Sequence, residues 1–130
     1  MNALLDTCAL LWFLRGDAEL SERATRLIEA PSTDAFVSAV SIWEIAIKAS
    51  TGKLQIPEGF LDSFEERLTA LGFEIRPVTF QHAAGVYSLP KVHQDPFDRL
   101  LISQCRAENL TAVTNDIQCS DSRYANHTLW

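Results

Sequence analysis

Residues 2–16, NALLDTCALLWFLRG, set the first elements of the fold. Residues 2–5 predict a buried strand that ends at Asp6, and the apolar run over 7–14 predicts a helix that stops near Gly16, a residue typical of helix C-termini. A carboxylate between a buried strand and an apolar helix costs desolvation free energy unless a helix cap or a cation satisfies it. Asp6 is therefore the first candidate site residue.

Helical and strand patterns alternate along the rest of the chain. Helices are expected over 21–30, 40–52, 57–72, from 79 to before Pro90 and from 95 onwards, and strands at 35–38, 73–78, 111–114 and 128–130, the last as an edge strand. Such alternation implies a mainly parallel sheet with helices on both faces. We therefore predict an α/β fold, a three-layer α/β/α sandwich, formed by a single domain over residues 1–130.

Charge limits the kinds of partner that the chain can hold. The net charge is -6, from 17 acidic and 11 basic side chains. This is the wrong sign for a protein that holds nucleic acid by its general field, so any nucleic-acid role must be local and metal-assisted. An acidic balance also suits a protein partner that brings arginine or lysine side chains to it.

The cysteines and the apolar runs exclude several other classes. Cys8, Cys105 and Cys119 are odd in number and far apart, which argues against a disulfide framework and a zinc site and predicts buried, reduced thiols. The N-terminus shows no export signal, and the apolar runs are too short to cross a bilayer. We expect a cytoplasmic protein without a membrane span.

Acidic side chains recur where predicted strands end or predicted helices begin. They are Asp6, Glu44, Asp95, Asp98 and Asp116. Ligands of parallel α/β sheets bind beyond the carboxyl ends of the strands, so we expect these acids to converge at one rim. Carboxylates brought together repel unless a cation lies between them, and Mg²⁺ or Mn²⁺ prefers several hard oxygen ligands. The pattern predicts metal-dependent phosphate chemistry.

Each acid also has a purely structural explanation. Ser41 and Glu44 match a capping box, which taken alone is the simpler interpretation of Glu44. Asp95 fits an N-cap, Asp98 can offset a helix dipole, and Asp116 can make an Asx-turn. Independent caps need not converge, however, and the metal site explains the whole set.

The remaining polar candidates favour structural roles. None of His82, His93 and His127 is expected to lie with the acids. His93 could orient Asp95 or touch substrate, but an ordinary loop hydrogen bond is the favoured interpretation. Lys48 and Arg99 are candidate phosphate contacts, but an ion pair with Glu44 four residues earlier is expected for Lys48 and solvated surface charge for Arg99.

Four stretches that carry these acids come in a characteristic order: LLDT at 4–7, VSAVSIWEI at 37–45, HQDPFDRLLI at 93–102 and VTND at 113–116. Together they resemble the PIN domain, and in particular the VapC-type toxins of bacterial toxin–antitoxin pairs. The resemblance covers essentially the whole chain and implies a PIN-like fold.

The resemblance also implies an activity, a cofactor and partners. It implies that the chain cuts RNA, and that Mg²⁺ or Mn²⁺ is bound by Asp6, Glu44, Asp98 and Asp116, with Asp95 and Thr114 as auxiliary residues. The family's members usually form homodimers and are silenced by an antitoxin that covers a hydrophobic groove. The polar stretch after Asp116 departs from the family pattern because it carries another acid, Asp121.

The expected chemistry is hydrolysis of an RNA phosphodiester, with one or two metal ions that activate a water and stabilise charge on the phosphate. The alternatives are a non-catalytic acidic module that receives a basic partner and a receiver-like signalling domain. The receiver needs paired acids after its first strand, whereas Asp6 is followed by Thr7 and Cys8. A phosphatase of the haloacid dehalogenase type is disfavoured in the same way, because Cys8 stands where it needs a second Asp.

Overall fold

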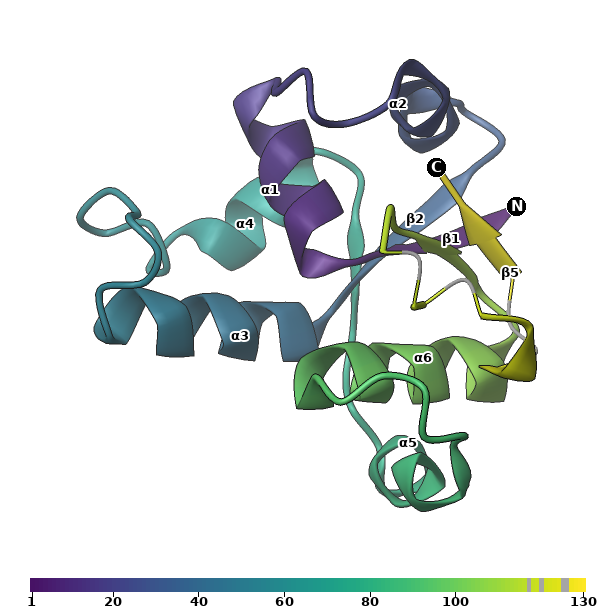
Figure 1. The fold of residues 1–130 in the computed structure, drawn as a ribbon. Helices are drawn as coiled ribbons and strands as arrows, with labels where there is room; N and C mark the ends of the chain where they lie inside the picture. Colours follow the sequence, from purple (N-terminus) through teal and green to yellow (C-terminus); the bar gives the residue numbers. More distant parts are fainter. Residues whose placement is uncertain (117, 120, 125–126) are drawn as a thin grey trace.

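The computed structural model describes residues 1–116, 118–119, 121–124 and 127–130, which form an α/β fold (Figure 1). Its strands are β1 (Asn2–Leu5), β2 (Asp34–Ser38), β3 (Glu74–Arg76), β4 (Thr111–Val113) and β5 (His127–Leu129). The α-helices in the described part are α1 (Thr7–Arg15), α2 (Glu22–Glu29), α3 (Ala39–Ser50), α4 (Phe64–Ala70), α5 (Phe80–Gly85) and α6 (Pro96–Glu108), and the 3-10 helices are η1 (Val86–Ser88) and η2 (Ser122–Tyr124). The predicted alternation of strands and helices is confirmed.

The strands form one parallel sheet in the order β3-β2-β1-β4-β5, so β5 is an edge strand as expected. Helices α1, α2 and α4 lie on one side of this sheet, and α5 and α6 lie on the other (Figure 1). Successive side chains of β1 point to opposite faces. Leu5 accordingly packs in the core beneath α1, α2 and α4, whereas Leu4 packs with Leu101 of α6.

Two boundaries differ from the sequence-based prediction. The helix expected over 57–72 begins only at Phe64, because Gly59 adopts a left-handed φ of 73° and residues 57–63 form turns. The strand expected over 73–78 is confined to β3, and Pro77, which has no N–H to donate, follows it directly.

The start of α3 overturns the capping-box interpretation of Glu44. Strand β2 runs straight into α3, and its last residue, Ser38, is the N-cap, with its side chain accepting a hydrogen bond from Val40 N. Ser41 is therefore inside the helix, where it is fully buried. Glu44 lies in the second turn, beyond the reach of a capping role.

The cysteines follow the prediction only in part. Cys105 and Cys119 are buried free thiols, but Cys8 is exposed, so the expectation of a buried thiol is wrong there. Cys8 lies on α1 between two buried neighbours, Thr7 and Ala9. Among the described residues, no helix is long and apolar enough to cross a membrane.

Candidate metal centre

Asp6 connects the end of β1 to the start of α1. Its Oδ1 accepts a hydrogen bond from Ala9 N at 2.7 Å, which makes Asp6 the N-cap of α1. Burial raises the pKa of Asp6, the hydrogen bonds from Thr114 and Ala9 oppose this, and the negative charges of Glu44 and Asp116 raise the pKa further. The helix cap therefore does not remove the repulsion that Asp6 experiences.

Glu44 is buried on α3 and faces α1. Thr7 Oγ1 donates a hydrogen bond to Glu44 Oε1 at 2.6 Å and lies 3.0 Å from Ser41 Oγ. Oε2 forms the predicted ion pair with Lys48, whose side chain is 41% exposed. Thr7, the residue after Asp6, thus links the start of α1 to Glu44 on α3.

Asp95 and Asp98 open α6 as expected. Asp95 is the N-cap, and its Oδ1 accepts hydrogen bonds from Phe97 N at 2.9 Å and Asp98 N at 3.3 Å. Burial and the charge of Asp95 raise the pKa of Asp98 to about 7; Asp6 and Glu44 contribute in the same direction, and the neighbouring His93 acts against them. An acid held this far from its usual pKa needs a positive partner to ionise easily.

Asp116 follows β4 and makes the predicted Asx-turn, in which Oδ1 accepts a hydrogen bond from Gln118 N at 2.9 Å. The buried Thr114 fixes its backbone, because Thr114 Oγ1 accepts a hydrogen bond from Asp116 N at 3.1 Å. Asp121, the competing acid, instead pairs with Arg123, which lowers the pKa of Asp121 to about 2. The structure thus brings Asp116, not Asp121, to the other acids.

His93 lies at the site, although the sequence-based prediction favoured an ordinary loop hydrogen bond for it. Its side chain is 7% exposed, and its Nε2 lies 3.0 Å from Asp98 Oδ2 and forms a 2.8 Å hydrogen bond with Asp116 Oδ2. The expectation that no histidine lies with the acids is therefore wrong for His93. The available signal was its position two residues before the Asp95 cap, which holds it at the N-terminus of α6. Together with Cys119, these three residues offer ligand atoms that all lie within 4.8 Å of one another.

Arg99 has a structural role in place of the expected surface position. It is half-buried, and its guanidinium donates hydrogen bonds to the backbone carbonyls of Val86, Pro90 and His93 at 3.0–3.2 Å. These bonds fasten the loop that carries His93 to α6. The geometry therefore does not support a phosphate contact by Arg99, whereas Lys48 stays at the edge of the acidic cluster.

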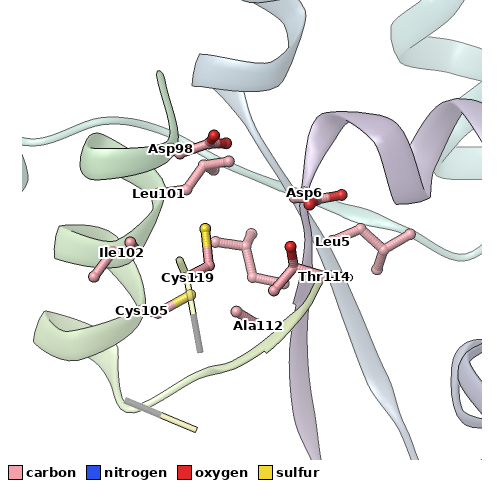
Figure 2. Close-up of a pocket in the computed structure, with 10 residues that line it drawn as sticks. Leu5, Asp6, Asp98, Leu101, Ile102, Cys105, Ala112, Thr114 and Cys119 are labelled. Carbon is pink, nitrogen blue, oxygen red and sulfur yellow. The ribbon is translucent and has the colours of Figure 1, made fainter. Parts of the chain in front are cut away.

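Two of the acids, Asp6 and Asp98, line a small pocket between α6 and the strands β1 and β4. Figure 2 shows the carboxylates of Asp6 and Asp98 at one end of this pocket, with apolar side chains such as Ile102 and Ala112 below them. Hard oxygen donors from four separate segments, with the pKa values of Asp6 and Asp98 raised, are the donor set that suits Mg²⁺ or Mn²⁺. The residues present therefore fit a hard divalent cation.

Comparison with known proteins gives one family and several similar folds. The PIN domain family matches residues 3–121. Similar solved structures include VapBC2 from Rickettsia felis bound to a promoter DNA fragment (TM-score 0.73, 18% identity, 99% of this chain and 98% of the other) and FitAcB from Neisseria gonorrhoeae (0.67, 19%, 98% and 96%). A DNA-bound VapBC from Salmonella typhimurium is also similar (0.71, 17%, 99% and 97%). At these identities the likeness concerns the fold, and no curated protein sequence matches the chain.

Proposed function

The chain belongs to the PIN domain family, and on this basis we propose that it is a metal-dependent endoribonuclease that acts in the cytoplasm as the toxin of a toxin–antitoxin pair. The observation that carries the proposal is the convergence of acids from four separate segments at one rim of the sheet. Burial and mutual repulsion raise the pKa of Asp6 and of Asp98, which is the cost of assembling such a cluster without a cation.

The ligands of Mg²⁺ or Mn²⁺ would be Asp6, Glu44, Asp98 and Asp116. Bound metal supplies Lewis acidity, which activates a water and stabilises the charge that builds up on the phosphate. Thr7 and Thr114 hold Glu44 and Asp6 through hydrogen bonds, so each carboxylate is oriented before a substrate arrives. Lys48 pairs with Glu44 and extends to solvent, where its ammonium group can meet an RNA phosphate.

We propose that the partners are RNA, a cognate antitoxin and a second copy of the chain. A further similar structure is described as a toxin–antitoxin complex from Klebsiella pneumoniae (TM-score 0.59, 18% identity, 88% of this chain and 86% of the other), which supports an antitoxin. An apolar groove between α3 and α4 offers a surface for it, lined by Ile42, Trp43, Leu61, Phe64 and Leu68 among others. Trp43 is 55% exposed there, and the net charge of -6 suits a basic partner.

The test is cleavage of total cellular RNA by the purified protein with Mg²⁺ or Mn²⁺, with and without EDTA, followed by mapping of the new RNA ends. We expect cleavage that EDTA removes and that Asp6→Asn abolishes. Asp121→Asn is the matched control, because this acid lies near Asp116 in sequence but pairs with Arg123. Binding of RNA or of a basic peptide with no cleavage by the wild type would favour the non-catalytic acidic module instead.

A further inference from the structure

His93 contacts two of the acids to which we assign metal binding, and these acids come from opposite sides of the site. Asp98 belongs to the first turn of α6 and Asp116 to the segment after β4, and Nε2 of one imidazole faces the Oδ2 atom of each. A donor that bonds to one carboxylate and lies 3.0 Å from an oxygen of the other offsets part of the repulsion between the two. The His93 imidazole therefore influences the distance between the carboxylates of Asp98 and Asp116.

The other ring nitrogen shows where the proton of His93 lies. Asp95 N donates a hydrogen bond to His93 Nδ1 at 3.1 Å, so Nδ1 is an acceptor and carries no proton. In this arrangement the proton is on Nε2, which hydrogen-bonds to Asp116 and lies 3.0 Å from Asp98 Oδ2. A protonated Nε2 cannot bind a metal, and moving the proton to Nδ1 would set it against the N–H of Asp95. The geometry therefore makes His93 a donor to the carboxylates and not a metal ligand.

The imidazole is also held rigidly. His93 N donates a hydrogen bond to the hydroxyl of Tyr124 at 2.9 Å, and its carbonyl accepts one from Arg99 at 3.0 Å. Tyr124 is fully buried, and Arg99 belongs to α6. The backbone on which the ring sits is thus fixed by η2 and by α6, independently of the acids.

We propose that His93 is a positioning residue that clamps Asp98 and Asp116 at the separation a hard divalent cation requires, before the cation arrives. The inference rests on the proposed function, because it concerns the same acids. Hydrogen-bond partners of metal ligands typically contribute 10- to 100-fold to metal affinity. The clamp acts through the carboxylates, so it requires a donor at the position of Nε2 and nothing else of the imidazole.

His82 offers a matched control. Its ring is buried, its Nδ1 accepts a hydrogen bond from Thr79 N at 3.1 Å, and its Nε2 lies 3.0 Å from Glu108 Oε2. The local arrangement is the same as that of His93, but the carboxylate belongs to the far end of α6. Replacement of His82 therefore perturbs a buried histidine–carboxylate contact without changing the acids of the metal centre.

The experiment measures Mn²⁺ affinity by titration calorimetry on the full-length protein, for His93→Asn, His93→Gln and His82→Asn. Asparagine keeps an acceptor for Asp95 N, but its own amide donor is too short to reach the position of Nε2, whereas the glutamine amide reaches that position. We expect Mn²⁺ binding about 10- to 100-fold weaker in His93→Asn, largely restored in His93→Gln and unchanged in His82→Asn. Pulsed EPR of the Mn²⁺-loaded wild type should show no directly bound nitrogen.

Unchanged Mn²⁺ affinity in His93→Asn, equal loss in His82→Asn, no recovery in folded His93→Gln, or a bound nitrogen in the EPR spectrum would each overturn the inference. Absence of Mn²⁺ binding by the wild type would overturn it as well. The ribonuclease proposal fails separately, if the wild type binds Mn²⁺ and leaves RNA intact. If the wild type cuts RNA and His93→Asn binds Mn²⁺ with unchanged affinity, only the clamp proposal is refuted.

Discussion

At each end of α6 a buried histidine contacts a carboxylate of that helix, but the net charge around the two contacts differs. At the C-terminal end, His82 faces one carboxylate, Glu108, and the guanidinium of Arg76 lies 3.7 Å from that acid. At the N-terminal end, His93 faces two carboxylates, Asp98 and Asp116. The first contact has its own counter-charge, whereas the second has an excess of negative charge.

The difference separates a buried histidine–carboxylate contact that serves the fold from the one to which we assign a role in ligand binding. A charge-balanced contact stabilises the packing of α5 on α6 without further help. An unbalanced one lowers stability in the absence of a cation, and at this end burial together with the charges of neighbouring acids raises the pKa of Asp98. The balance of charge around the imidazole, more than its burial, separates the two regions.

The largest expected effect comes from removing one charge at each end of α6. We expect Asp98→Asn to lower RNA cleavage at least about 100-fold, since even residues that only support metal ligands contribute 10- to 100-fold. Its stability without metal should be unchanged or higher. Glu108→Gln should retain cleavage but lose about 1–3 kcal/mol of stability, because His82 and Arg76 lose a charged partner. Cleavage rates and urea unfolding measure the activity and the stability of both variants. Equal cleavage by Asp98→Asn and Glu108→Gln would contradict the proposed difference between the two ends of α6.

The second prediction concerns stabilisation by metal. Saturating Mg²⁺ or Mn²⁺ should raise the free energy of unfolding of the wild type by about 2.7 kcal/mol at 100 times the dissociation constant. The increase should vanish in Asp98→Asn and persist in Glu108→Gln. Thermal melts with and without EDTA measure it, and a melting temperature indifferent to either ion would argue against a metal centre.

The third prediction is a pH dependence of stability in EDTA. The pKa of Asp98 is raised from 3.8 to about 7 in the folded chain, so the folded state binds more protons than the unfolded state between these values. Stability contributed by Asp98 is therefore present at low pH and is lost as the pH rises from about 4 to about 7. Asp98→Asn should flatten this part of the unfolding profile, and Glu108→Gln should not. A wild-type profile that rises through this window would contradict the assignment.

The smallest effect is expected for Lys48→Ala. The Lys48–Glu44 pair is partly exposed, so its loss should cost no more than about 1 kcal/mol. If the ammonium group meets an RNA phosphate, the KM for RNA should rise while kcat changes little. Steady-state kinetics on a defined RNA separate the two constants, and Lys91→Ala, at an exposed loop position, is the control.

The local pattern of the sequence predicted most of the fold and the position of each acid. Asp6 was predicted from the end of a strand, Asp95 from the proline that follows it and Asp116 from its turn. These signals could be used because they involve neighbours within a few residues. The contact between His93 and Asp116 joins residues 23 apart, and the anchor from His93 to Tyr124 joins residues 31 apart. No local periodicity encodes such contacts, so the clamp became visible only in the folded chain.

The strand order also has a consequence for synthesis. Strand β1 is made first but is flanked in the sheet by β2 and by β4, which comes more than a hundred residues later. Pairing over such a separation is slow, and it cannot begin until β4 has left the ribosome. Asp116 follows β4, so a growing chain cannot assemble the cluster around Asp6. On the proposed function, a nascent chain that has not yet folded β4 into the sheet therefore lacks one of the four acids to which we assign metal binding.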